Sequence, residues 1–230
     1  MKICTHAVLT AVPLCALAAA APGGIILGEN LLNNHDAEAG PGGSGQVVPI
    51  PGWSVTEGLF TVAAYGATPE TLQLGDPGPA DRAANYFTGG GSDTSVAEQR
   101  FNLFPLASRI DAGEISFDLS GWLGAASVDF DGALLSVTFL DNTLTEIGSA
   151  STGTVIRGIA NPVGLSFFAT DDLIPVGARE AVVELTFLRN TNGNAFNDGS
   201  ADNVSFVVIP SPGPIALFGF AGVLGFQRRR

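Results

Sequence analysis

The chain is poor in the residues that most often carry chemistry. Its only lysine is Lys2, and its two cysteines, Cys4 and Cys15, lie within the first 15 residues. The rest of the chain therefore has no disulfide, no thiolate metal ligand and no cysteine nucleophile. Histidine is nearly as scarce. After His6 only His35 remains, which excludes histidine-rich zinc sites and leaves one candidate base for a Ser-His-Asp triad.

The motifs of common enzyme classes are missing as well. No Gly-x-Ser-x-Gly turn accompanies His35, and no lysine follows the glycine-rich residues 87–93, so they do not form a phosphate loop. Carboxylate pairs that could hydrolyse glycosides are present at Asp129/Asp131 and Asp171/Asp172. Since 22 acidic residues are spread along the chain, such pairs are more typical of a solvated surface. We expect no enzyme.

Positive charge is lacking from the body of the chain. All 22 acidic residues lie between Glu29 and Asp202, where the only basic residues are six arginines. Such a body repels nucleic acid and anionic lipid, so nucleic acid is not an expected partner. The composition suits solubility, divalent cations or neutral sugars.

A helical apolar period is also missing, and strand patterns take its place. Apolar and polar residues alternate strictly in residues 115–121, 182–187 and 203–208, which predicts half-buried strands. Further candidate strands are residues 59–65, 85–88, 96–103, 134–140, 154–159 and 163–170. Glycine and proline turns separate them. The sequence predicts an all-β fold, an antiparallel jelly-roll β-sandwich of nine or ten strands.

The two ends differ from this body. Residues 1–20 combine Lys2, an apolar stretch and small alanines, as in a secretory signal peptide. We therefore expect a leader at 1–20, a β-sandwich domain at 21–208 and a separate segment at 209–230. That last segment has prolines, a glycine-interrupted apolar run and three terminal arginines. The prolines and arginines argue against a core strand, and the apolar run is short for a transmembrane helix.

The order of these features resembles the PEP-CTERM sorting signal of exported Gram-negative proteins. The residues that carry the resemblance are Pro210, Pro212, Gly213, Arg228, Arg229 and Arg230, with "IPSPG" where the family has Pro-Glu-Pro. The resemblance implies a C-terminal hydrophobic helix, transient membrane insertion of the tail and handling by an exosortase-type membrane protease. It also implies delivery to the cell surface, outer membrane or extracellular matrix.

The body resembles bacterial galactose-binding-like sandwich domains, which include carbohydrate-binding modules. The resemblance rests on the order of "NLLNNHDAEAG", "IPGWSV", "YFTGGGSDTSVAEQRF" and "NDGSADNVSFVV". It implies that the first and last strands lie side by side and that Glu38 and Asp202 help to hold a structural Ca²⁺. Ca²⁺ prefers six to eight oxygen ligands, which carboxylates and carbonyls of glycine-rich turns can supply. Alternatively, Glu38 and Asp202 are ordinary turn residues.

Sugar binding requires aromatic platforms and planar polar groups. Trp122, Tyr86, Asn85 and Arg100 are the candidates. Trp122 lies in the turn-like segment "SGWLGAAS", where exposure is more plausible, whereas in the resembling families the tryptophan that matches Trp53 is usually in the core. The Asn/Gly/Asp-rich residues 190–203 are interpreted as a loop, either a ligand or metal loop or a long hairpin turn. The first hypothesis is an exported module that binds a polysaccharide or matrix glycan. The second is a structural surface or biofilm matrix protein without a small ligand. The third is a glycan-active enzyme.

Overall fold

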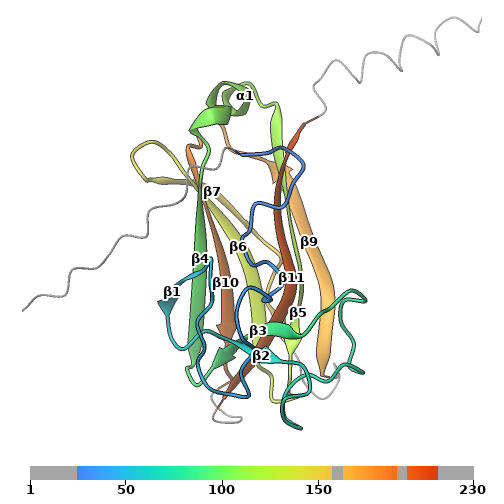
Figure 1. Ribbon diagram of the computed structural model, residues 1–230. Helices are drawn as coiled ribbons and strands as arrows, with labels where there is room; N and C mark the ends of the chain where they lie inside the picture. Colours follow the sequence, from blue (N-terminus) through green and yellow to red (C-terminus); the bar gives the residue numbers. More distant parts are fainter. Residues whose placement is uncertain (1–24, 157–162, 191–195, 212–230) are drawn as a thin grey trace, which may run out of the picture.

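The computed structural model describes residues 25–156, 163–190 and 196–211, which form two antiparallel sheets packed face to face (Figure 1). The predicted leader lies outside these residues, as does the predicted sorting segment apart from its first three residues. No helix in the described ranges has the length and apolar character needed to cross a membrane.

The first sheet has the strand order β1-β4-β10-β6-β7, with β8 also paired to β6. Its strands are β1 (Ser54–Glu57), β4 (Thr94–Asn102), β10 (Glu180–Leu188), β6 (Gly132–Leu140), β7 (Glu146–Ser151) and β8 (Val155–Ile156). The second sheet has the order β2-β3-β11-β5-β9. Its strands are β2 (Thr61–Ala64), β3 (Asn85–Gly90), β11 (Asn197–Pro210), β5 (Ile115–Ala125) and β9 (Gly164–Leu173).

The chain passes back and forth between the sheets. The run β3, β4, β5, β6 alternates between the second and the first sheet, and so does the run β9, β10, β11. This connectivity is that of a jelly roll. The predicted fold class, an all-β antiparallel jelly-roll sandwich, is confirmed.

Alternation along the strands explains why the sheets pack as they do. On β5, the side chains of Ile115, Phe117 and Leu119 are buried between the sheets, whereas Asp118 is exposed on the outer face. The core is rich in phenylalanine. Phe60, for example, lies with its ring centroid 5.0 Å from that of Phe187 across the sandwich. Burial of such side chains contributes about 1.5–3 kcal/mol each.

The predicted core tryptophan, Trp53, is buried in this cluster. Its ring meets Phe87 edge-on, with centroids 5.5 Å apart, and its indole N–H donates to the carbonyl oxygen of Asn34 over 3.2 Å. The polar end of the indole is therefore satisfied inside the core.

The structure departs from the sequence-based interpretation in several places. β1 and β7 were not predicted, because they are sheet-edge strands whose side chains are mostly exposed and show no apolar alternation. The sequence around Trp122, interpreted as turn-like, is part of β5. β11 begins at Asn197, inside a segment interpreted as a loop, and continues through Ile209 and Pro210, two residues past the expected domain boundary. A 3-10 turn, Phe104–Leu106, and a single turn of helix, α1 (Ala107–Asp111), are too short to give a sequence period.

The N-terminal segment lies beside the last strand. The N–H of Gly28 donates to the Val208 carbonyl and that of Leu31 to the Phe206 carbonyl, each over 2.9 Å. Asn30 forms an antiparallel bridge with Val207. The segment thus extends the second sheet next to the C-terminal half of β11, while β3 pairs with the N-terminal half of that strand.

Candidate functional site

Two of the four predicted sugar-binding residues are buried. Asn85 and Tyr86, both on β3, are 6% and 1% exposed. The side-chain amide of Asn85 donates to Oε2 of Glu38 over 3.2 Å, and the hydroxyl of Tyr86 accepts the N–H of Leu72 over 3.1 Å. Burial raises the pKa of the Tyr86 phenol well above its ordinary value. Both side chains are engaged within the protein and cannot contact a ligand on its surface.

The other two lie on opposite sides of the sandwich. Arg100 is on the outer face of the first sheet, where its Nε donates to Glu98 and its Nη1 to Glu180, each over 2.8 Å. Trp122 is on the outer face of the second sheet and meets Phe167 edge-on, with ring centroids 5.9 Å apart. The structure therefore does not bring the four predicted residues into one site.

The predicted calcium ligands lie near each other, but protein donors occupy them. Oε1 of Glu38 accepts the N–H groups of Ala84 and Asn85 over 2.9 and 2.6 Å, which fixes the start of β3. Asp202 accepts the Tyr65 hydroxyl over 2.8 Å and the N–H of Asn203 over 2.7 Å.

The Asp202 carboxyl is nevertheless in an unfavourable place for a charge. Burial raises its pKa to about 7, against the lowering effect of these two hydrogen bonds, and the charges of Glu38 and Asp36 add to the rise. Calcium at Glu38 and Asp202 stays a prediction.

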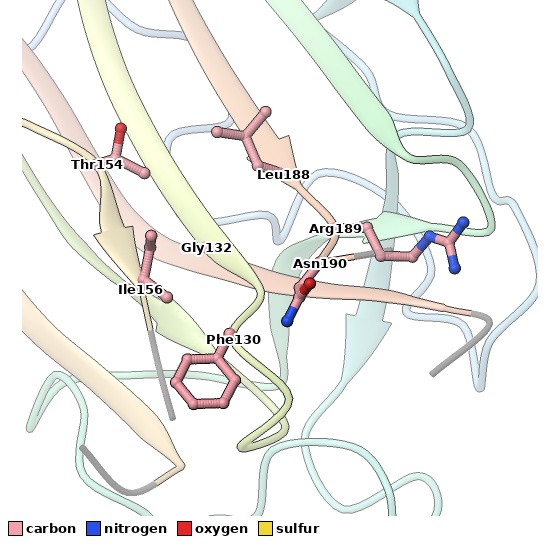
Figure 2. Close-up of a pocket in the computed structure, with 7 residues that line it drawn as sticks. All are labelled: Phe130, Gly132, Thr154, Ile156, Leu188, Arg189 and Asn190. Carbon is pink, nitrogen blue, oxygen red and sulfur yellow. The ribbon is translucent and has the colours of Figure 1, made fainter. Parts of the chain in front are cut away.

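A pocket of about 340 Å³ opens where β10 ends and where β6 and β8 lie side by side. Its lining consists of Phe130, Gly132, Thr154, Ile156, Leu188, Arg189 and Asn190, all drawn in Figure 2. Of these residues only Asn190 lies in a segment that the sequence marked as a candidate, the Asn/Gly/Asp-rich residues 190–203. The lining residues come from strands that are distant in sequence, and the strand order of the first sheet brings these residues together.

Phe130 is the unusual member of this pocket. Its ring is 51% exposed, and its backbone has φ +73, in the left-handed region that residues other than glycine seldom adopt. The sequence carried a weak signal for this, an aromatic residue between two aspartates in a turn.

The loop that carries Phe130, residues 126–131, is tied down on both sides of the ring. The carbonyl of Asp129 accepts the side-chain amide of Asn190 over 2.8 Å. The carboxylate of Asp131 accepts the backbone N–H groups of Asn190 and Asp198, each over 2.6 Å. These bonds connect the loop to the end of β10 and the start of β11, and they hold the Phe130 ring at the rim.

The pocket offers the groups that a sugar needs. Phe130, Ile156 and Leu188 supply apolar surface for the C–H face of a sugar ring, and Thr154 supplies a hydroxyl group for hydrogen bonding. The guanidinium of Arg189 points away from Phe130 in Figure 2 and forms an ion pair with Asp93. The Arg189 guanidinium, the positive charge among the lining residues, is therefore already paired with a carboxylate.

Three carboxylates gather behind the pocket wall. One oxygen each from Asp129, Asp131 and Asp198 lies within 4.8 Å of the others. Burial first, and then the charges of Asp129 and Asp131, raise the pKa of Asp198 to about 7. Burial also raises the pKa of Asp131. The set is all oxygen, which suits a hard cation.

The carboxylate pairs considered for glycoside hydrolysis are now placed. Asp129 and Asp131 belong to the three-carboxylate cluster, and neither lines the pocket among the residues that the structure describes. Asp171 and Asp172 are exposed neighbours on β9, where successive side chains point to opposite faces.

No family model and no curated protein matches the chain. Solved structures with a similar arrangement include the enzymatically active domain of tailspike protein 4 of bacteriophage CBA120, at 18% identity and a TM-score of 0.47. That match covers 78% of this chain and 21% of the tailspike chain. The C-terminal family 22 carbohydrate-binding module of a Clostridium thermocellum xylanase is similar at 15% identity, with a TM-score of 0.46, over 76% of this chain and 92% of the module.

An arabinose-bound α-L-arabinofuranosidase is similar at 14% identity with a TM-score of 0.44, over 82% of this chain and 27% of the enzyme. This chain thus spans about a quarter or less of the tailspike and arabinofuranosidase chains. Similarities at this level assign neither a ligand nor an activity to it.

Proposed function

We propose that the chain is an exported, non-catalytic protein of the cell surface or extracellular matrix that binds carbohydrate in the pocket beside Phe130. One observation carries the proposal: an aromatic ring is held in solvent, at a strained backbone position, on the rim of a pocket with polar atoms. Export is supported by the leader sequence, and surface or matrix delivery by the PEP-CTERM-like order of the tail.

The energetics of Phe130 favour a role outside the fold. A left-handed backbone at a residue other than glycine costs about 1–3 kcal/mol. A core aromatic residue would offset that cost by burial, but half of the Phe130 surface remains in water. Hydrogen bonds from the loop to Asn190 and Asp198 offset this strain, and a sugar stacked on the exposed ring would add a contact that the fold itself does not supply.

The charge of the protein narrows the ligand class. The chain has a formal net charge of −12 at pH 7. A uronic acid or sulfated glycan would be repelled. We therefore propose a neutral glycan, of which a short stretch fits a pocket at the small end of the usual size range.

The test is a binding screen of the purified chain against neutral and acidic polysaccharides, followed by calorimetry with Phe130→Ala. We expect saturable binding to a neutral glycan and a loss of affinity of about tenfold or more in the variant, because stacked aromatics dominate such interfaces. Phe104→Ala is the matched control. Phe104 is 57% exposed and lies in the 3-10 turn beside α1.

The rival surface is the Trp122–Phe167 pair on the outer face of the second sheet. Phe167 is 56% exposed, so Phe167→Ala tests that surface without disturbing the core. Loss of binding in Phe167→Ala but not in Phe130→Ala would move the site there and reject the pocket. Binding to no glycan would favour the structural matrix protein. Release of reducing ends from any bound glycan would contradict the non-catalytic proposal.

A further inference from the structure

The three-carboxylate cluster has no assigned purpose in sugar binding. Asp129 and Asp131 come from the loop between β5 and β6, and Asp198 comes from the second position of β11. Asp131 is fully buried, and the N–H groups of Asn190 and Asp198 hold its two oxygens in place. The cluster is thus assembled from two segments, the β5–β6 loop and the start of β11, that the jelly-roll topology brings together.

Asp129 gives a second, independent observation. Both oxygens of its carboxylate are buried, and within the described part of the chain no N–H or O–H group donates to them; their neighbour at hydrogen-bond distance is another carboxyl, that of Asp198. A buried carboxylate without a donor costs several kcal/mol, and two further carboxylates beside it increase that cost. Proteins keep such a group only where something neutralises it.

Among the described residues, Arg189 is the cation that acts on the cluster, and it does not neutralise it. Arg189 is close enough to lower the pKa of Asp131, but burial outweighs its effect, and its guanidinium forms an ion pair with Asp93. Protonation of one carboxyl, such as that of Asp198, would also reduce the negative charge of the cluster. A protonated Asp198 could donate to Asp129, but two charged carboxylates would remain side by side and Asp129 would still have no backbone donor.

We propose that Asp129, Asp131 and Asp198 form a calcium site that fixes the loop carrying Phe130. Oxygens held about 2.3–2.6 Å from one ion lie within about 5 Å of each other, and the three carboxylates satisfy this spacing. No histidine or thiol takes part, so Ca²⁺ fits better than a transition metal. Ca²⁺ also tolerates irregular geometry, whereas Mg²⁺ requires a near-ideal octahedron.

This site is separate from the calcium predicted at Glu38 and Asp202. Asp198 and Asp202 are four positions apart on β11, which corresponds to about 13 Å along an extended strand. Their surroundings also differ. The Asp202 oxygens accept from Tyr65 and Asn203, whereas in the described part of the chain no backbone N–H donates to the Asp129 oxygens, which face the Asp198 carboxyl.

The decisive variant is Asp129→Asn, studied in the full chain by calorimetry with CaCl₂ and by thermal melting in EDTA and in Ca²⁺. For the unchanged chain we expect Ca²⁺ binding and a melting temperature several degrees higher in Ca²⁺ than in EDTA. For Asp129→Asn we expect an affinity at least about tenfold weaker at this site. In EDTA the variant should melt at the same temperature as the unchanged chain or higher, because it removes an uncompensated buried charge.

Glu38→Gln is the control and should keep the Asp129-dependent binding. Asp198→Asn provides a second variant if Asp129→Asn fails to fold, and it should weaken Ca²⁺ in the same way. The proposal is overturned if Asp129→Asn and Asp198→Asn bind Ca²⁺ as the unchanged chain does, if only Glu38→Gln loses binding, or if Mg²⁺ binds as tightly as Ca²⁺. None of these readouts requires a sugar, so failure of the glycan proposal would leave this test intact.

Discussion

At the scale of single residues, two glutamates are cross-strand neighbours on the outer face of the first sheet. Glu184 on β10 lies directly across from Glu98 on β4, while Arg100 binds Glu98 and Glu180. Burial first, and then the charge of Glu98, raises the pKa of Glu184, with Arg100 acting in the opposite direction. The folded state therefore binds the Glu184 proton more tightly than the unfolded state. Ionisation of this residue opposes folding once the pH exceeds its ordinary pKa.

From this follows a pH-dependent effect of Glu184→Gln. At pH 7 the variant should melt a few degrees higher than the unchanged chain, because it removes the repulsion between the negative charges of Glu184 and Glu98. The gain should shrink as the pH falls toward 4, where Glu184 is protonated in both states. Melting curves at pH 7 and pH 4.5 measure it, with Glu146→Gln on the exposed edge strand β7 as the control. A gain of equal size at both pH values would show that charge is not the cause.

At the scale of elements, one side chain fastens the N-terminal segment to β11. Oδ1 of Asn30 accepts the N–H groups of Leu32 and Phe206 over 3.2 and 3.0 Å, and its Nδ2 donates to the Val204 carbonyl over 3.0 Å. Backbone bonds continue the pairing on both sides. The side chain of Asn30 thus supplies the hydrogen bonds that a paired backbone would give to β11 at the point where the N-terminal segment leaves the strand.

Asn30→Ala should destabilise the protein by about 1–3 kcal/mol, because it leaves backbone groups beside β11 without partners. Chemical denaturation measures the change, and Glu29→Ala, at an exposed neighbouring position, should have little effect. Faster amide exchange confined to residues 25–33 and β11 would localise the loss. If both variants unfold at the same denaturant concentration, the segment does not depend on this side chain.

The elements also show which parts of the fold a sequence can predict. β5 and β10 bury one face on the other sheet, so their apolar residues alternate and both strands were predicted. β1 and β7 lie at the sheet edge with mostly exposed side chains, so no pattern marks them. Trp122 was misplaced in a turn because two glycines flank its segment, although pairing with β9 and β11 on either side keeps it extended.

The candidate site was beyond prediction for a related reason. Asp131 and Asp198 are 67 positions apart and meet only because β5, β6, β10 and β11 are neighbours in a jelly roll. The sequence shows the acidic residues but not which of them lose contact with water. Likewise, it places Asn85 and Arg100 among polar candidates but cannot show that the first is buried and the second ion-paired.

At the scale of the whole molecule, negative charge is the dominant electrostatic feature. Between Glu29 and Asp202, 22 acidic residues face six arginines, and the ion pairs formed by those arginines are mostly exposed. Exposed pairs contribute little, so mutual repulsion of the acids should outweigh them. Folding therefore concentrates charge of one sign.

Added salt should raise the melting temperature by a few degrees between 50 and 500 mM NaCl in EDTA, because screening weakens the repulsion. Tetramethylammonium chloride at equal ionic strength serves as the control for specific sodium binding. An unchanged or falling melting temperature in both salts would mean that the arginine pairs dominate after all.

The length of β11 has a consequence for how the protein presents itself. The strand's 14 residues span about 40 Å, from the acidic cluster and pocket at its start to its last residues beside the N-terminal segment (Figure 1). Gly28 lies beside Val208, so both ends of the described sandwich are at the pole near α1. Whatever holds the protein by either end leaves the opposite pole free. Copies attached side by side at that pole would present their pockets at the same distance from the surface. Weak contacts of several pockets with one long polymer would then combine into tighter binding through multivalency.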